Sequence, residues 1–210
     1  MKFSRFAWFL AFIGVGLLTG CASHAVDSAI EKPASAVAPI GGFSPGQGFI
    51  SRGCGFYIST DGLLITCRHV LAGGKTWVLG SGSAPLPAEV VVEDPASDLA
   101  LLRVRLPREQ DRPGRVAFFE LKQVDFDEMG HLRVAGGHGV VHGLFNHFET
   151  VGRDIDFSAQ IGAADEGAPV LDDSGRVIGI VRGPYEGKPG EFLAIPVWRA
   201  VRMLPGKDAN

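Results

Sequence analysis

Hydrophobic and polar residues alternate in short blocks along most of the chain, and the clearest block runs from Gly53 to Val70. Two apolar runs flank a polar turn, Ser59–Gly62, whose Asp-Gly pair is a strong hairpin signal between runs of β-prone residues. The second run, Leu63–Thr66, is followed closely by His69. Because a hairpin holds the side chain that follows it in a fixed place, His69 is a candidate general base. A surface or core histidine is the simpler alternative for this residue considered by itself.

Similar short blocks, separated by Gly, Pro and polar residues, predict further strands. We expect them at Thr76–Leu79, Glu89–Val92, Leu99–Val104, Val116–Phe119, Leu132–Ala135, Ile155–Gln160, Val177–Val181 and Phe192–Pro196. The Gly/Ser/Pro segment before Glu89 and the Gly- and His-rich segment 136–151 are expected to be loops, and Val197–Leu204 a short helix. With 29 Gly and 13 Pro among 210 residues, this pattern favours an all-β fold.

Composition places the chain among folded globular proteins, since 46% of its residues are hydrophobic and 20% are charged. Lys2 and Arg5 are the only charged residues among the first 21, so the remainder carries 18 basic against 23 acidic residues. Nothing in this balance indicates nucleic-acid binding.

Residues 1–21 have the pattern of a targeting segment rather than of a folded element. Lys2 and Arg5 precede an apolar run, Phe6–Leu18, that is shorter than a comfortable membrane span. The segment ends Leu18-Thr19-Gly20-Cys21, which resembles the lipobox of bacterial lipoproteins. The resemblance implies cleavage before Cys21 and lipid attachment to it. An ordinary secretory signal that happens to end near a cysteine is the alternative.

Further expectations about location and domain boundaries follow from the residues after Cys21. Ala22 and Ser23 resemble the residues that follow the cysteine in outer-membrane lipoproteins, so we expect an outer-membrane anchor facing the periplasm. Residues 22–46 are rich in Ala, Ser, Pro and Gly and are expected to be a flexible tether. The folded domain is then expected over 47–206.

Two cysteines remain, Cys54 and Cys67, on the two sides of the predicted hairpin. Paired cysteines in an oxidising compartment are usually bonded, so we expect a disulfide between them. Two buried thiols, or a reactive Cys67 beside His69, are the alternatives. We expect the reactive-thiol alternative to be weak, on the expectation that a base two residues from its nucleophile points away from it.

Three motifs share their order and surroundings with a known family. His69 lies in ITCRHVLAGG, Asp98 in DPASDLALLRV, and Gly167-x-Pro169 precedes DDSGRVIGIVRG. Together they resemble trypsin-like serine proteases over about residues 48–204, and the FLAIPV segment is closest to the HtrA/Deg branch. The resemblance implies two antiparallel Greek-key barrels and a cleft between them that holds His69 as base and Asp98 as its orienting acid. From the charged, Pro-containing connector we expect the boundary between the barrels near 105–115, and we expect no PDZ domain because few residues follow Leu204.

The chain departs from this family where the nucleophile is expected. The family carries Gly-x-Ser-Gly-Gly-Pro, whereas this chain has Ala164-Asp165-Glu166-Gly167-Ala168-Pro169. Glu166 therefore stands at the serine position, and a carboxylate is a poor acyl-accepting nucleophile that puts charge where an oxyanion must form. Ala164 replaces the glycine that supplies an oxyanion-hole N–H, and Ala168 replaces a second glycine. We therefore expect the chain not to be a serine protease of the usual mechanism.

Other candidate side chains have ordinary structural explanations. Ser174 lies in a predicted turn and Ser158 within a predicted strand, and neither has a base placed near it by the sequence. Four histidines, His131, His138, His142 and His147, follow no standard zinc spacing. We expect no metal and no cofactor.

The sequence thus predicts a lipid-anchored pseudoprotease that binds a protein or peptide partner in the cell envelope or acts as a scaffold. An active serine-type endopeptidase with a rearranged site is one alternative. A purely structural envelope lipoprotein is another.

Overall fold

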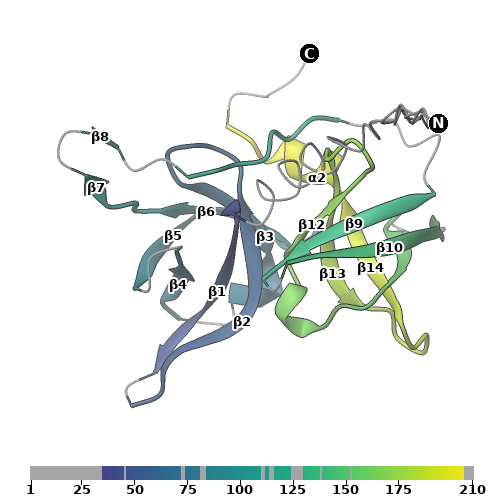
Figure 1. Ribbon diagram of the computed structural model, residues 1–210, viewed down its shortest axis with the longest axis horizontal. Coiled ribbons are helices and arrows are strands. Elements are labelled where there is room, and N and C mark those ends of the chain that lie inside the picture. The colour runs from purple at the N-terminus through teal and green to yellow at the C-terminus, as the bar shows by residue number, and fades with distance from the viewer. Residues whose placement is uncertain are drawn as a thin grey trace, which may run out of the picture.

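The protein folds into two β-barrels that lie side by side (Figure 1). The computed structural model describes residues 35–205 except 45, 72–73, 81–83, 110–111, 114–115, 124–129, 138 and 152. The predicted signal segment, Cys21 and residues 22–34 of the predicted tether lie outside the described residues. Within the described residues, no helix combines the length and the apolar character that crossing a membrane requires.

The first barrel closes in the order β1-β2-β3-β6-β5-β4, with antiparallel neighbours throughout. Its hairpin β2–β3 is the predicted one, with Phe56 opposite Ile65 and Tyr57 opposite Leu64. The strands are β1 (Val37–Ser44), β2 (Gly48–Tyr57), β3 (Leu63–Cys67), β4 (Thr76–Leu79), β5 (Pro85–Asp94) and β6 (Leu99–Val104).

The second barrel closes in the order β10-β11-β14-β13-β12-β9, also antiparallel. Helix α2 (Val197–Arg202) follows its last strand, as predicted. The strands are β9 (His131–Gly136), β10 (Gly139–Phe148), β11 (Ile155–Ala159), β12 (Pro169–Leu171), β13 (Val177–Pro184) and β14 (Glu191–Pro196). This architecture confirms the predicted all-β double barrel.

The connection between the barrels contains a two-stranded sheet of β7 (Arg108–Glu109) and β8 (Arg112–Pro113). Two short 3-10 helices, η1 (Arg68–Leu71) and η2 (Ala163–Asp165), follow β3 and β11. His69 lies in η1, and Glu166 directly follows η2.

One hydrophobic cluster joins the barrels. Leu64 and Leu102 of the first barrel share it with Leu171, Ile180 and Ile195 of the second, and all five side chains are fully buried. A second cluster fills the other end of the second barrel around Phe157 and also contains Cys54, from the first barrel. Burial of apolar surface on both sides of the boundary therefore holds the two barrels together.

Four sequence predictions of local structure were wrong. Strand β1 lies inside the predicted tether, because Ala38 and Ile40 point into the first barrel despite their Gly- and Pro-rich surroundings. Strand β5 begins at Pro85, within the predicted loop, and β10 forms across the predicted Gly- and His-rich loop. The predicted strand at 116–119 is not one, although Phe119 is buried against Phe56. Tertiary pairing, rather than local composition, decides each of these segments.

Candidate active site

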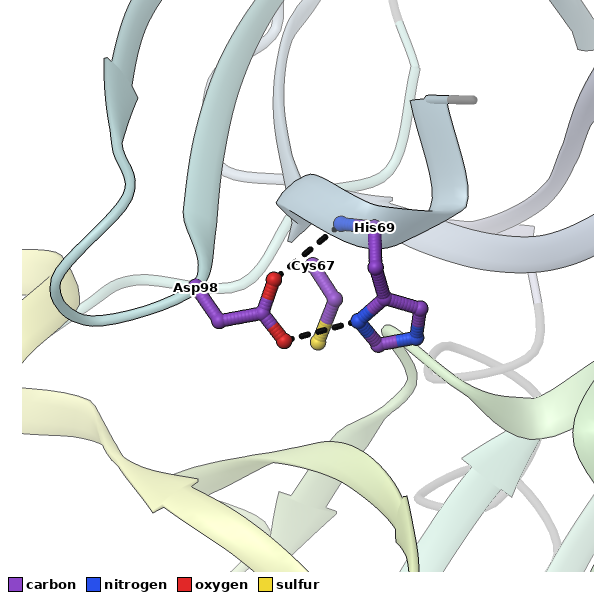
Figure 2. Close-up of side chains that lie close together, drawn as sticks. All are labelled: Cys67, His69 and Asp98. Carbon is purple, nitrogen blue, oxygen red and sulfur yellow. Dashed lines mark hydrogen bonds and ion pairs between the residues drawn. The ribbon is translucent and has the colours of Figure 1, made fainter.

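His69 and Asp98 meet in the first barrel as the sequence predicts. His69 lies in η1, directly after β3, and Asp98 ends the turn that leads into β6. The His69 ring Nδ1 lies 2.7 Å from Asp98 Oδ2, and the His69 backbone N–H donates to Asp98 Oδ1 at 3.1 Å (Figure 2). Both carboxylate oxygens thus hold the imidazole in one orientation.

The backbone of Asp98 is in the left-handed region, with φ of 54°. A non-glycine residue rarely adopts this conformation, and such strain concentrates at functional sites. The carbonyl of Asp98 accepts a hydrogen bond from Arg68 N–H at 2.9 Å, so the turn is tied to η1. Its side chain consequently faces His69.

Glu166 reaches His69 from the second barrel. Its Oε2 lies 3.0 Å from the other ring nitrogen, Nε2, and its side chain is only 17% exposed. The imidazole therefore lies between two carboxylates that are 68 positions apart in the chain, Asp98 and Glu166. Glu166 occupies the place from which a nucleophile would exchange a proton with the base.

The loop before Glu166 is closed by its own hydrogen bonds. Asp165 N–H donates to Gly162 O at 2.9 Å, and Glu166 N–H donates to Ala163 O at 3.3 Å. Ala164, at the expected oxyanion-hole position, is exposed in the middle of η2. In acyl transfer the N–H of the nucleophile residue itself is one of the oxyanion donors. Here that N–H already has an acceptor inside the loop.

Strand β2 packs directly against this loop from the first barrel. Cys54 N–H donates to Glu166 O at 2.8 Å, and Gly167 N–H donates to Val181 O at 2.8 Å. Gly167 has φ of +88°, and a Cβ at this position would lie 2.0 Å from Cys54 O. Only glycine fits there, so the loop position of Glu166 depends on contact between the barrels.

Comparison with known proteins decides the family. The model of the trypsin-like peptidase domain matches residues 53–180. The chain belongs to the trypsin-like peptidase family. Most of the matched segment is described by the structure, and it includes His69, Asp98 and Glu166.

Its similarity to individual relatives supports the HtrA/Deg branch that the sequence indicated. The chain is 30% identical over 177 residues to a "probable periplasmic serine endoprotease DegP-like" of Bartonella henselae, covering 74% of this chain and 33% of that protein. A protein of the same name from Brucella suis is 31% identical, with 74% and 32% covered. An uncharacterized protein of Sinorhizobium fredii is 34% identical over 164 residues, with 72% and 25% covered. The chain thus spans a third or less of the length of these curated relatives.

The two carboxylates change the protonation of the family's base. Burial lowers the pKa of His69, but hydrogen bonds to Asp98 and Glu166 and the negative charges of both outweigh it, so this pKa is raised above 6.5. The side chain of His69 is 41% exposed, which keeps water in contact with the ring. The arrangement therefore favours an imidazolium, whereas a general base must be neutral.

Sequence reasoning missed a network of arginine and aspartate side chains that continues from Asp98. Arg182 lies on β13 with its Nε 3.9 Å from Asp98 Oδ2 and its Nη1 2.8 Å from Asp154 Oδ2. Arg199 of α2 pairs with the other oxygen of Asp154 at 3.0 Å. The sequence offers no signal for this network, because its members come from four separate segments that only the fold brings together.

The predicted disulfide is not formed, because Cys54 and Cys67 both carry free, buried thiols. Cys54 packs in the hydrophobic cluster around Phe157, whereas Cys67 packs in the cluster that joins the barrels and its Sγ donates to Val181 O at 3.2 Å. Burial raises the pKa of both thiols. Since the thiolate is the reactive form, neither cysteine has the environment of a nucleophile.

The other sequence candidates lie away from His69 or in ordinary contacts. Ser158 hydrogen-bonds with Asn146, and Ser174 sits in an exposed turn whose N–H groups donate to Asp172. His131 and His142 are exposed on β9 and β10, and His138 lies outside the described residues.

Two groups of described side chains have donor atoms within reach of a single metal ion. One is Cys67, His69 and Asp98, and the other is His147, Glu149 and Asp156. The first needs a thiolate, which burial of Cys67 opposes. In the second, the Asp156 oxygen that faces His147 is 3.1 Å from the ammonium of Lys188. Ion pairs account for the second group and for His69 with Asp98 in the first. The thiol of Cys67 lies close to His69, so the expectation that these two side chains point apart was wrong, but burial opposes loss of the thiol proton.

Proposed function

We propose that this protein is a catalytically inactive member of the trypsin-like peptidase family that works by binding a protein or peptide in the cell envelope. The observation that carries the proposal is the hydrogen bond at 3.0 Å between Glu166 and the Nε2 of His69. A carboxylate at this position cannot deliver an alkoxide to a scissile carbonyl, and its charge opposes an oxyanion next to it. The hydrogen bond from Glu166 N–H to Ala163 O removes an oxyanion donor as well.

The envelope location rests on two independent features. Relatives named as periplasmic endoproteases have the same domain. The Leu18-Thr19-Gly20-Cys21 motif supports lipidation at Cys21 and an outer-membrane anchor. A lipid-anchored domain that keeps the protease fold without the nucleophile is suited to present its cleft to envelope proteins as a binding surface or scaffold.

Fluorophosphonate labelling and peptide hydrolysis test the catalytic part. We expect the native protein to show no labelling and no hydrolysis of casein or of a peptide library. The triple variant Glu166→Ser, Ala164→Gly, Ala168→Gly is the positive control, since its labelling shows that the probe can react at this site. Robust hydrolysis by the native protein that His69→Ala abolishes would overturn the proposal.

Peptide-array binding separates a binding protein from a purely structural lipoprotein. A defined subset of sequences should bind the native protein, and the same array should bind less to a variant with Gly183→Trp, placed beside Glu166. In the structure, a Cβ on Gly183 would lie 3.3 Å from Glu166 Oε1. Uniform absence of binding would favour the structural alternative.

Mass spectrometry and detergent partitioning test the anchor. The mature protein should begin at a lipid-modified Cys21 and partition into detergent. Cys21→Ala should yield unprocessed protein without that lipid. Unchanged lipid mass in the Cys21→Ala protein would refute this attachment site.

A further inference from the structure

The hairpin β1–β2 carries an exposed aromatic surface that is not part of the site around His69. Phe43 is 54% exposed and lies opposite Phe49, and Ile50 is 43% exposed one position further along β2. Trp77 of β4 pairs with Gly41 and contacts the ring of Phe43, with centroids 5.9 Å apart. Phe43, Phe49 and Trp77 lie on one face of the hairpin, whereas Ile50, which follows Phe49 along β2, lies on the other. We call these four residues, which together line both faces of the hairpin, the aromatic hairpin surface. The hairpin β1–β2 itself projects from the first barrel (Figure 1).

The charged side chains at the border of this surface are mainly basic. No Asp, Glu, Lys or Arg occurs from residue 33 to residue 51. Lys75 lies over the Trp77 ring, with its Nζ 4.9 Å from the centroid. The guanidinium of Arg52 lies beside Gly42, 3.6 Å from where a Cβ on that residue would be. Glu89, on the neighbouring β5, is ion-paired with Arg105. Apolar rings with cations at their border, and no acid along the hairpin, match the chemistry of an anionic lipid surface.

The length of the chain before the fold keeps this surface near a membrane. Thirteen residues, Ala22 to Ala34, separate Cys21 from the first described residue, Ser35. A chain of this length spans at most about 50 Å when extended, and about 20 Å on average when flexible. A bilayer that holds a lipid on Cys21 is therefore within reach of the hairpin.

We propose that the aromatic hairpin surface inserts into the interfacial layer of the bilayer and orients the domain on the membrane. This inference rests on the lipid anchor of the proposed function. Phe and Trp rings are favoured at the depth of the lipid headgroups, where Lys side chains meet anionic lipids. With the tether and the hairpin both in contact with the bilayer, the cleft around His69 takes a preferred orientation instead of tumbling at the end of a tether.

Site-specific labelling of the lipidated full chain in vesicles tests this insertion. An environment-sensitive fluorophore is attached to Gln47→Cys at the hairpin tip or, as the matched control, to Ser174→Cys in an exposed turn of the second barrel. The native thiols Cys54 and Cys67 are buried and stay unlabelled. Vesicles contain phosphatidylglycerol and phosphatidylethanolamine with or without a spin-labelled lipid. We expect blue-shifted emission and at least twofold quenching at position 47, and neither at position 174.

Three further variants sharpen the readout. Phe43→Ser with Ile50→Ser should abolish the quenching at position 47, whereas Val151→Ser, which removes an equally apolar but 88% exposed side chain elsewhere, should leave it intact. Lys75→Glu should reduce the quenching in anionic vesicles and have less effect in neutral ones.

Several outcomes would overturn the inference. One is equal or absent quenching at positions 47 and 174 in protein that floats with the vesicles. Another is an emission shift that follows the protein-to-lipid ratio and persists in detergent, which would mean that a second copy covers the surface. If mass spectrometry finds no lipid on Cys21, the lipid anchor of the proposed function is wrong. Binding of the hairpin to a membrane can then still be tested by itself, from the quenching at position 47 when anionic vesicles are added.

Discussion

At the scale of single residues, the replacement of a hydroxyl by the carboxylate of Glu166 reverses the chemistry around His69. A serine hydroxyl would give its proton to the neutral imidazole. The carboxylate of Glu166, 3.0 Å from the ring, instead stabilises the protonated imidazolium. The same His69–Asp98 pair, joined at 2.7 Å, thus becomes part of a charged hydrogen-bonded bridge between the barrels. Retention of these two residues is accounted for by structure as well as by ancestry.

The raised pKa of His69 makes stability depend on pH in a defined direction. Its folded pKa lies above the unfolded value of about 6.5, so the stabilisation from this pairing is fully present below that value and is lost as pH rises through the folded pKa. Glu166→Gln should lower the folded pKa and weaken this pH dependence. An NMR titration of the His69 ring and urea unfolding at several pH values measure both effects. Glu186→Gln, in the exposed turn after β13, controls for net charge. An identical His69 pKa in Glu166→Gln and native protein would contradict the assignment.

Restoring the nucleophile alone should not restore a protease. Glu166→Ser supplies an oxygen beside His69 but leaves Ala164 in the closed loop, and loss of one oxyanion donor typically costs about 10²–10³ in rate. Adding Ala164→Gly and Ala168→Gly should increase fluorophosphonate labelling and casein hydrolysis above the level of the single variant. His69→Ala in that background should remove the gain. Equal rates for the single and triple variants would show that the loop is already competent.

At the scale of elements, the short loop from η2 to β12 is positioned by strand β2 of the other barrel. Cys54 N–H donates to Glu166 O, and the Cys54 carbonyl packs so close to Gly167 that a Cβ there would lie 2.0 Å from its oxygen. Thr66 Oγ1 also donates to that carbonyl, at 2.7 Å. The loop is thereby coupled to the hairpin that carries His69.

A pair of glycine substitutions measures this coupling. Gly167→Ala places a methyl group 2.0 Å from Cys54 O, whereas Gly187 has a similar φ of +78° with no atom within 4 Å. Gly187→Ala should destabilise the protein by about 1–2 kcal/mol, the cost of a left-handed residue. Gly167→Ala should cost about 1–3 kcal/mol more through overpacking. Urea unfolding gives both values, and equal losses would mean that the loop moves away from β2 without penalty.

The thiols of the hairpin β2–β3 provide a second test at this scale. Because both are buried and face different hydrophobic clusters, native protein should not react with a thiol reagent. Denatured protein that has never been reduced should gain two alkyl groups, one on Cys54 and one on Cys67. Mass spectrometry of protein purified from the periplasm decides this. Absence of alkylation at both positions would show that a disulfide forms there.

At the scale of the whole molecule, the cluster shared by the barrels predicts a single cooperative unfolding transition. Ile180 is fully buried in this cluster, and Ile180→Ala should cost about 2–5 kcal/mol. The unfolding midpoints reported by Trp77 in the first barrel and Trp198 in α2 should move together. Val151→Ala, at an 88% exposed position, should change the midpoint little. Separate transitions for the two tryptophans would show that the barrels unfold independently.

Much of the fold and part of the site follow from local sequence. The Asp-Gly hairpin, the strands at Thr76–Leu79 and Leu99–Val104, and the terminal helix are encoded by nearby residues, so the pattern predicts them closely. The motifs around His69 and Asp98 identify the base and its orienting acid, and the family motif marks Glu166 as the substituted position. Pairing of His69 with Asp98 follows from these motifs because both residues sit at the ends of adjacent strands, β3 and β6.

Only the tertiary structure decided the remaining features. Strand β1 forms in a Gly- and Pro-rich segment because its neighbours β2 and β4 supply hydrogen-bond partners and a core for Ile40. Cys54 and Cys67 keep free, buried thiols, and the sulfur of Cys67 donates to Val181 O. The Arg182 network behind Asp98 joins atoms from separate segments. Local patterns encode strands and turns, whereas contacts across a barrel boundary depend on where both barrels place their chains, and no local pattern contains that information.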